Sequence, residues 1–193
     1  MKPLILASKS RARAELLKKC GFKFKIFPSN ARELKVLPHH AVKEILIKNA
    51  LNKAKTVSGY FKKGAVIAAD TVVLQGGRIF GKPSNLKDAF LTIKRLSNAP
   101  SSVYTGLAVI DIENKKGYVD YCKTKVWLSK LSDKEIKNYL KNSKGRHINF
   151  AGGFDIQGRG SLFIERIEGC FYNVVGLPLP KLYKLLKKCG IEI

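Results

Sequence analysis

Acidic residues are scarce in this sequence, and the resulting positive charge limits the kinds of partner that the protein is expected to bind. Only 14 Asp and Glu stand against 37 Lys and Arg, so the 193-residue chain carries a formal net charge of +23. Such a charge permits binding to the phosphates of nucleic acids. However, lysine outnumbers arginine 29 to 8 and spreads over every expected helix, whereas base reading and bidentate phosphate binding favour arginine. We therefore do not expect nucleic acid as a specific partner. The positive field instead favours capture of a polyanionic small substrate.

Cysteine and histidine are also few, and neither forms a metal-binding pattern. The four cysteines are widely separated and include no C-x-x-C pair, so reduced structural thiols are expected in place of a zinc site or a disulfide framework. They are Cys20, Cys122, Cys170 and Cys189. The three histidines, His39, His40 and His147, have no second His or Cys at ligand spacing. We interpret them as solvated or capping residues.

Long hydrophobic runs are missing. No apolar stretch approaches the roughly 20 residues that a membrane helix needs. The apolar start at residues 4–7 is too short for the core of a signal peptide, and Lys9 and Arg11 follow at once. With 45% hydrophobic residues the chain can still bury a sizeable core. The sequence therefore predicts a cytoplasmic globular protein without membrane association, with residues 1–193 forming a single domain.

Several motifs of nucleotide-binding and hydrolytic proteins are absent. No G-x-x-x-x-G-K-[ST] loop occurs, and Gly158-Arg-Gly160 lacks the third glycine of a dinucleotide fingerprint, which argues against kinases, ATPases and dehydrogenases. No G-x-S-x-G elbow is present, so serine-hydrolase chemistry has no local support. A hydrolase that uses a carboxylate and a metal is favoured.

One carboxylate stands where none is expected. Asp70 interrupts the apolar run at residues 65–74, which is rich in β-branched residues and therefore predicts a buried strand. Burying an unpaired carboxylate costs several kcal/mol. Because basic residues are so abundant, we expect lysine or arginine side chains, a divalent metal, or both, to offset that cost. The end of this strand is the predicted active site.

The flanking segments alternate between strand and helix. We expect strands at 4–7 and 23–27, a helix at 11–20 that ends before Gly21, and a long helix at 39–57. Gly76-Gly77 predicts a hairpin back to residues 78–80, and a helix follows at 86–96. Strands at 101–112 and 118–128 form a second hairpin. A capping box at 132–135 begins a helix that ends near 142, and a last helix covers 178–189. This order predicts an α/β protein with a mixed sheet.

Basic and polar residues flank the expected strand ends. The loop Ser8-Lys9-Ser10 joins a strand to a helix whose first turn holds Arg11 and Arg13, so its N–H groups are able to cradle an anion. The alternative is that Ser10 caps the helix and the arginines are solvated. Lys82 follows the hairpin and is able to fold back toward Asp70, and Lys53 lies beside the apolar stripe of the long helix.

A glycine-dense stretch covers residues 151–160. Its glycines would let the backbone approach a planar ligand, and Gln157 offers a donor and an acceptor suited to a base edge. A tight structural turn is an equally good interpretation of the same residues.

Taken in order, six segments resemble the Maf-like family of nucleoside triphosphate pyrophosphatases, which is related in fold to inosine triphosphatases. They are LASKS at 6–10 with Arg13, ADTVV at 69–73, GKP at 81–83, YTG at 104–106, AGGFDIQG at 151–158 and NVVGLPL at 173–179. The resemblance implies an elongated mixed β-sheet flanked by helices, with two lobes around a central cleft. It also implies hydrolysis of a nucleoside triphosphate to the monophosphate and pyrophosphate with a divalent metal cation, Mg²⁺ or Mn²⁺.

The resemblance assigns roles to particular residues. Asp70 is the catalytic acidic residue, acting on water directly or through a metal that it holds together with Glu33. The resemblance implies that one set of basic and hydroxyl residues binds the phosphates, and that a second set determines which base is accepted. The phosphate set is Ser8, Ser10, Arg13, Lys53 and Lys82, and the specificity set is Ala12, Thr71 and Gln157.

Three positions depart from the family pattern. The family reads Ser-Pro-Arg-Arg where this chain has Ser10-Arg11-Ala12-Arg13, it carries a lysine where Phe150 stands, and it has a small residue at Asp155. Thr71 with Gln157 is similar to the branch that acts on dTTP and UTP, but Ala12 lacks the arginine of that branch. The expected substrate is therefore of the dTTP/UTP type or a modified nucleotide.

Two other functions stay open at this stage. The family is named after septum formation, so a non-catalytic regulator of cell division is one alternative, and a basic nucleic-acid-binding protein is another. A homodimer is expected only because small cytoplasmic enzymes are often dimeric.

Overall fold

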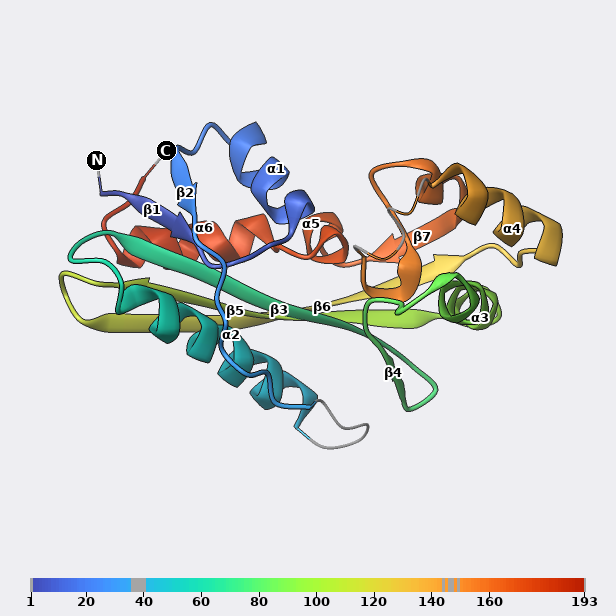
Figure 1. The fold of residues 1–193 in the computed structure, drawn as a ribbon, viewed down its shortest axis with the longest axis horizontal. Helices are drawn as coiled ribbons and strands as arrows, with labels where there is room; N and C mark the ends of the chain where they lie inside the picture. The colour runs from blue at the N-terminus through green and yellow to red at the C-terminus, as the bar shows by residue number, and fades with distance from the viewer. Residues whose placement is uncertain (1, 36–40, 144, 146–147, 149, 193) are drawn as a thin grey trace.

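A single seven-stranded mixed sheet runs the length of the molecule (Figure 1). The computed structural model describes residues 2–35, 41–143, 145, 148 and 150–192. The strands are β1 (Leu4–Leu6), β2 (Phe24–Ile26), β3 (Ala65–Gln75), β4 (Arg78–Phe80), β5 (Ser101–Asp111), β6 (Lys116–Leu128) and β7 (Ile164–Glu168). The helices are α1 (Arg11–Lys19), α2 (Val42–Ser58), α3 (Leu86–Leu96), α4 (Asp133–Asn142), α5 (Phe171–Val175) and α6 (Leu179–Lys188).

The sheet order is β2-β1-β3-β5-β6-β7, and β4 folds back on β3. Strands β2, β1 and β3 are parallel, whereas β3, β5, β6 and β7 are antiparallel. The expected mixed α/β sheet is thus confirmed. Three long strands, β3, β5 and β6, pass through both halves of the elongated molecule (Figure 1). Helices α1, α2 and α6 cover one half, while α3, α4, β4 and β7 form the other, which matches the predicted two lobes.

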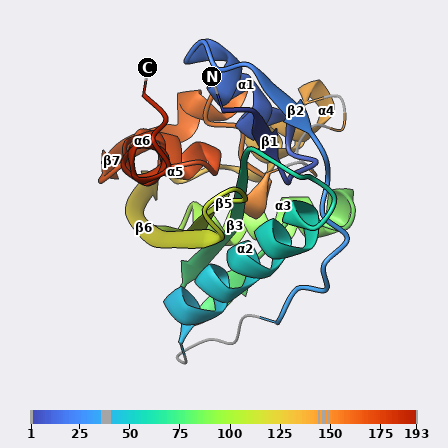
Figure 2. The same ribbon diagram turned by 90° about the vertical axis from the view of Figure 1, so that its left-hand side faces the viewer.

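Alternation along β3 separates two cores. Ala65, Ile67 and Ala69 pack into a cluster with α1 and α6, and Val66 and Ala68 pack against α2 on the opposite face. Figure 2 shows these helices on opposite sides of the sheet. Because side chains alternate along a strand, Asp70 lies on the α2 face and Thr71 on the α1 face. The side chains of these two adjacent polar residues therefore lie on opposite faces of the sheet.

The outer edge of β3 has a gap in its pairing. Strand β1 pairs with β3 as far as Ile67, and β4 begins to pair with it at Val73. Among the described strands none pairs with this edge over residues 68–72. Asp70 and Thr71 lie in the gap, so the sheet is open at the place where the sequence predicts the site.

Gly106 lets α2 lie unusually close to the sheet. It is the β5 partner of Asp70, and a Cβ atom there would collide with the backbone of Leu46 in α2. The close approach brings the polar face of α2 to the carboxylate of Asp70.

Most local signals of the sequence hold in the structure. The capping box of α4 forms between Ser132 and Glu135, and Gly76 and Gly77 take positive φ angles of 52° and 73° in the β3–β4 turn. Helix α2 begins at Val42; the expected start at His39 lies outside the described residues, as do His40 and His147. Strand β7 and helix α5 were not expected. The four cysteines are free thiols, and no helix in the described part of the chain is long and apolar enough to cross a membrane.

Candidate functional site

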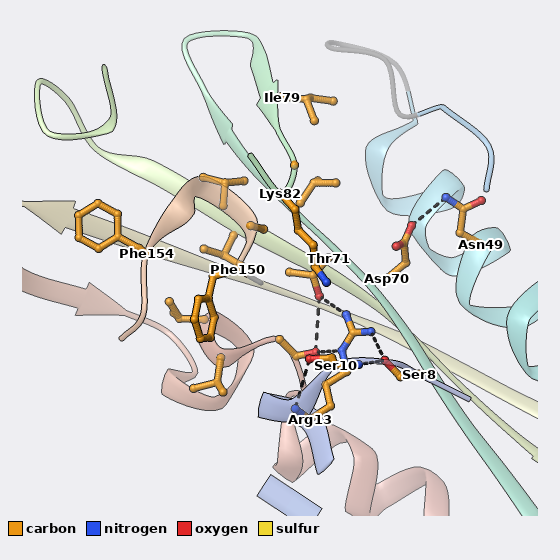
Figure 3. Close-up of a pocket in the computed structure, with 18 of the residues that line it drawn as sticks. Ser8, Ser10, Arg13, Asn49, Asp70, Thr71, Ile79, Lys82, Phe150 and Phe154 are labelled. Atoms are coloured by element: carbon orange, nitrogen blue, oxygen red, sulfur yellow. Dashed lines mark hydrogen bonds between the residues drawn. The ribbon is translucent and has the colours of Figure 1, made fainter. Parts of the chain in front are cut away.

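A cavity of about 1010 Å³ opens at the gap in β3 (Figure 3). One half is polar, and the other is walled by valine, leucine and phenylalanine side chains. The polar half receives residues from the β1–α1 loop, α2, β3 and the β4–α3 loop. A ligand with a charged part and a planar apolar part fits such a division.

Arg13 ties three segments together at the polar end. Its Nε donates to the Gly176 carbonyl at 2.8 Å, its Nη1 to the Ala69 carbonyl at 2.9 Å and to Ser8 Oγ at 3.1 Å, and its Nη2 to Thr71 Oγ1 at 2.9 Å. Since a guanidinium has five N–H donors, one N–H of Nη2 is left for a ligand. Burial lowers the pKa of Arg13, and the carboxylates of Asp70 and Glu33 act in the opposite direction.

The hydroxyl groups of Ser8 and Ser10 accept hydrogen bonds from the segment that begins α1. Ser8 Oγ accepts hydrogen bonds from Arg13 Nη1 and from the Ser10 N–H, and Ser10 Oγ accepts from the Arg13 N–H at 3.4 Å as the cap of α1. The cap interpretation of Ser10 is therefore confirmed, and its binding of phosphate stays a prediction. With its lone pairs occupied by donors, Ser8 has its own O–H free to bind an anionic oxygen. Both residues line the cavity.

Asp70 is held by two donors from α2. Its Oδ1 accepts from Lys53 Nζ at 2.9 Å, and its Oδ2 accepts from Asn49 Nδ2 at 2.8 Å. Asp70 is only 8% exposed, and Asn49 only 2%. A lysine therefore binds the buried carboxylate, as expected, and an amide that was not expected binds it as well.

Asn49 is the important residue that sequence reasoning missed. Besides Asp70 it binds both backbone groups of Leu34, accepting from the N–H at 2.8 Å and donating to the carbonyl at 3.0 Å. It thereby fixes the segment that carries Glu33 beside α2. The only available signal was a polar residue one position before Ala50 in the apolar stripe of this helix.

Lys53 also contacts Glu33, whose Oε1 lies 2.6 Å from its Nζ. One ammonium thus bridges two carboxylates. Two carboxylates with room for substrate phosphates form the kind of donor set that Mg²⁺ and Mn²⁺ accept, so these residues fit a divalent cation. Within the described ranges no group of three or more His, Cys, Asp or Glu residues is able to hold a metal ion, so further ligands would have to come from substrate or water.

Lys82 points from the β4–α3 loop toward Thr71 (Figure 3). It makes no hydrogen bond or ion pair with any described residue, Asp70 included. Burial of its amine, with the nearby charges of Arg13 and Lys53, lowers the pKa of Lys82, while Glu33 acts in the opposite direction. A cation without an anionic partner, held among other cations, is suited to receive a polyanion.

The three predicted specificity residues are placed differently. Thr71 lines the cavity, but its hydroxyl is engaged by Arg13 and by Thr105 Oγ1 at 2.9 Å. Ala12 packs against the core on α1, and Gln157 is exposed; neither is among the residues that line the cavity. Their role in base choice stays a prediction.

The glycine-dense stretch supports the wall of the apolar half. The Gly152 N–H donates to the Gly81 carbonyl at 2.9 Å, and a Cβ at Gly152 would collide with Leu96. These glycines therefore serve close packing against the Lys82 loop. Phe150 and Phe154 flank them and line the cavity (Figure 3). Asp155 accepts from the N–H groups of Gln157 and Gly158, which closes the following turn.

Comparisons with known proteins find relatives along the whole chain. The chain is 41% identical over 196 residues to a dTTP/UTP pyrophosphatase from Caldicellulosiruptor saccharolyticus, covering 100% of this chain and 98% of the relative. It is 40% identical to a dTTP/UTP pyrophosphatase from Clostridium tetani, covering 98% of each. A nucleoside-triphosphatase / dITP/XTP pyrophosphatase structure from Mycobacterium abscessus matches with a TM-score of 0.39 and 12% identity, over 67% of this chain and 75% of its own.

A family model settles the classification. The model described as Maf-like protein matches residues 3–189, which is nearly the whole sequence. The chain therefore belongs to the Maf-like protein family.

Proposed function

We propose that this protein hydrolyses a nucleoside triphosphate of the dTTP/UTP type to the nucleoside monophosphate and pyrophosphate. The names of the full-length relatives support this reaction. The observation that carries it is the position of Asp70, a nearly buried carboxylate in the wall of a large cavity that also holds Arg13, Lys53 and Lys82.

The polar half binds the triphosphate. Lys82 supplies a cation that pairs with none of the described residues, Arg13 supplies one remaining N–H, and Ser8 and Ser10 supply their hydroxyl groups. Electrostatic groups that are already in place stabilise the charge that develops on transferring phosphates at little reorganisation cost. Holding the chain of phosphates in this half directs the nucleoside toward the apolar half, where Phe150 and Phe154 offer ring contacts.

In this proposal Asp70 acts on water. In the proposed reaction a water oxygen forms a bond to the α-phosphorus, and the bond from that phosphorus to the α,β-bridging oxygen breaks. The water proton passes to the Asp70 carboxylate, and pyrophosphate leaves with the electron pair of the broken bond. Asn49 binds one oxygen of Asp70 and so limits the directions from which the carboxylate accepts the proton.

A divalent metal belongs to the proposal because the carboxylates fit one. Asp70 and Glu33 are the residues that would hold Mg²⁺ or Mn²⁺, and such an ion, when bound, neutralises phosphate charge and polarises the phosphate oxygens.

The test is release of pyrophosphate from dTTP, UTP, CTP, GTP and ATP, each supplied alone with Mg²⁺ or Mn²⁺. We expect release that needs the metal and is largest for dTTP or UTP. Asp70→Asn is expected to lower kcat by about 10²–10⁴-fold, since general-base assistance is typically of that size. Equal release by the Asp70→Asn protein would contradict the assignment of Asp70, and no release from any nucleotide by the unaltered protein would contradict the proposed function.

A further inference from the structure

We propose that the Lys53 ammonium occupies the place of the divalent cation in the nucleotide-free protein, so that Lys53 and the metal compete for Glu33 and Asp70. This inference rests on the proposed function. It predicts that the metal enters together with the triphosphate, because the phosphates give Lys53 a new anionic partner.

The contacts of Lys53 carry the argument. Its Nζ lies 2.6 Å from Glu33 Oε1 and 2.9 Å from Asp70 Oδ1, so a single cation holds both carboxylates. Its side chain is only 12% exposed, and so is that of Asp70. A partly buried ammonium between two carboxylates balances part of their charge and occupies the space where their oxygens converge.

The Asp70 carboxylate and the backbone next to Glu33 are held in this arrangement, whereas the Glu33 side chain is 57% exposed. Asn49 binds the other oxygen of Asp70 and both backbone groups of Leu34, the residue after Glu33. A divalent ion that reached the same oxygens would stand close to the Lys53 charge, and like charges at short range repel strongly where water is partly excluded. Metal binding therefore requires Lys53 to turn away.

Lys53 gains a new anionic partner only when a substrate is present, because Glu33 and Asp70 are the only carboxylates among the described residues that line the cavity. Arg13 and Lys82 reach this half as cations, and the Ser8 oxygen already accepts two hydrogen bonds. A triphosphate supplies several anionic oxygens among them. The lysine then changes from a counter-charge for the carboxylates to a ligand for phosphate.

The inference predicts that one substitution strengthens the binding of the metal and weakens the binding of the nucleotide. Lys53→Met keeps most of the side-chain length and removes the charge. We expect the nucleotide-free Lys53→Met protein to bind Mn²⁺ at least about tenfold more tightly than the unaltered protein, measured by the electron paramagnetic resonance signal of free Mn²⁺. We expect the same protein to bind dTTP about tenfold more weakly in the presence of EDTA, measured by equilibrium dialysis.

Three control proteins identify the cause. Lys53→Arg keeps the positive charge and is expected to gain no Mn²⁺ affinity. Lys55→Met removes a lysine from the exposed side of the same helix and is expected to leave both affinities unchanged. Adding Glu33→Gln to Lys53→Met is expected to abolish the gain in Mn²⁺ affinity, because one of the two carboxylates is lost.

Unchanged or weaker Mn²⁺ binding by a folded Lys53→Met protein would overturn the inference, as would an equal gain in Lys55→Met. Circular dichroism checks that each protein is folded, and Lys53→Gln replaces Lys53→Met if the latter is not. Because Mn²⁺ is titrated without nucleotide, the result does not depend on turnover. Failure of the proposed function would instead appear as absent pyrophosphate release by the unaltered protein.

Discussion

At the scale of single residues, Asn49 joins two parts of the site that are far apart in the sequence. It donates to Asp70 and closes both hydrogen bonds with Leu34. Unlike Lys53 it carries no charge, so its contribution is one of position. Removing its side chain leaves a buried carboxylate oxygen and two backbone groups without their partner.

We expect Asn49→Ala to lower kcat for dTTP by about tenfold or more, and to lower the free energy of unfolding by about 1–3 kcal/mol because buried groups are left unpaired. Hydrogen exchange at the Leu34 amide is expected to become faster. Asn52→Ala, one turn further along α2, is the matched control and is expected to change none of these. An Asn49→Ala protein with unaltered kcat would show that Asp70 is positioned without Asn49.

Single residues could be predicted from the sequence where the pattern that indicates them lies within a few neighbouring residues. Asp70 was found because a carboxylate in an apolar run is visible within ten residues of sequence. The cap of α1 by Ser10 was visible in the same way. The bonds of Arg13 to Gly176 and of Asn49 to Asp70 join distant residues, and a single sequence carries no pattern that reports such pairs.

At the scale of elements, the contact between α2 and β5 sets the geometry around Asp70. Gly106 makes that contact possible because it has no side chain in the way of the Leu46 backbone. We expect Gly106→Ala to push α2 outward, lower the free energy of unfolding by about 1–3 kcal/mol, and reduce kcat by separating Asn49 and Lys53 from Asp70.

Gly117, in the neighbouring strand, provides the comparison. A Cβ there would lie 3.7 Å from Leu51 Cδ1, which is an ordinary contact. Urea unfolding and pyrophosphate release of Gly117→Ala are therefore expected to stay close to those of the unaltered protein. Equal effects of the two substitutions would mean that space for α2 is not the reason for Gly106.

A second element-scale contact fixes the first residues of the chain to the end of β5. Lys2 Nζ lies 2.7 Å from Oδ2 of the fully buried Asp111. Burial alone would raise the pKa of Asp111, but the hydrogen bonds from Lys2 and Asn114 lower it below its ordinary value. The hydrogen bond to Asp111 raises the pKa of Lys2.

These shifts predict how stability depends on pH. A depressed carboxyl pKa contributes stability above its ordinary value of 3.8, and that contribution is lost as the pH falls through the native pKa. A raised lysine pKa contributes below 10.5 and is lost as the pH rises through the native pKa. We expect Lys2→Met to cost about 1–3 kcal/mol in urea unfolding at pH 7, and we expect this cost to shrink as the pH falls below 3.8. Lys94→Met, which removes the exposed pair with Asp133, is expected to cost less than about 1 kcal/mol over the same pH range. A Lys2→Met cost that did not shrink as the pH fell would contradict this account.

Element-scale prediction from sequence succeeded where periodicity and turn residues were strong. The β5–β6 hairpin, α3, α4 and α6 follow the expected ranges closely. It failed for β7 and α5, which have five residues each, too few to show a period. Strand β7 owes its conformation to pairing with β6, and such tertiary pairing is not encoded in the five residues themselves.

At the scale of the whole molecule, the excess of positive charge acts on the rate at which substrate arrives. The cavity wall carries more basic than acidic residues, namely Lys9, Arg13, Lys35, Lys53, Arg78 and Lys82 against Glu33 and Asp70. We expect kcat/KM for dTTP to fall roughly threefold or more between 0.05 M and 0.5 M NaCl, with kcat nearly constant, because salt screens the field that attracts the triphosphate. A kcat/KM that does not depend on salt would show that the net charge of +23 has no part in capture.

The gap along β3 limits which chains are able to pair with the sheet there. Unpaired strand edges invite other chains to add a strand and aggregate. Here the free edge covers only residues 68–72, with β1 ending on one side and β4 beginning on the other. Arg13 already occupies the Ala69 carbonyl within it. An extended peptide therefore finds too few free backbone groups to pair with, and the opening admits small molecules while resisting invasion by another protein chain.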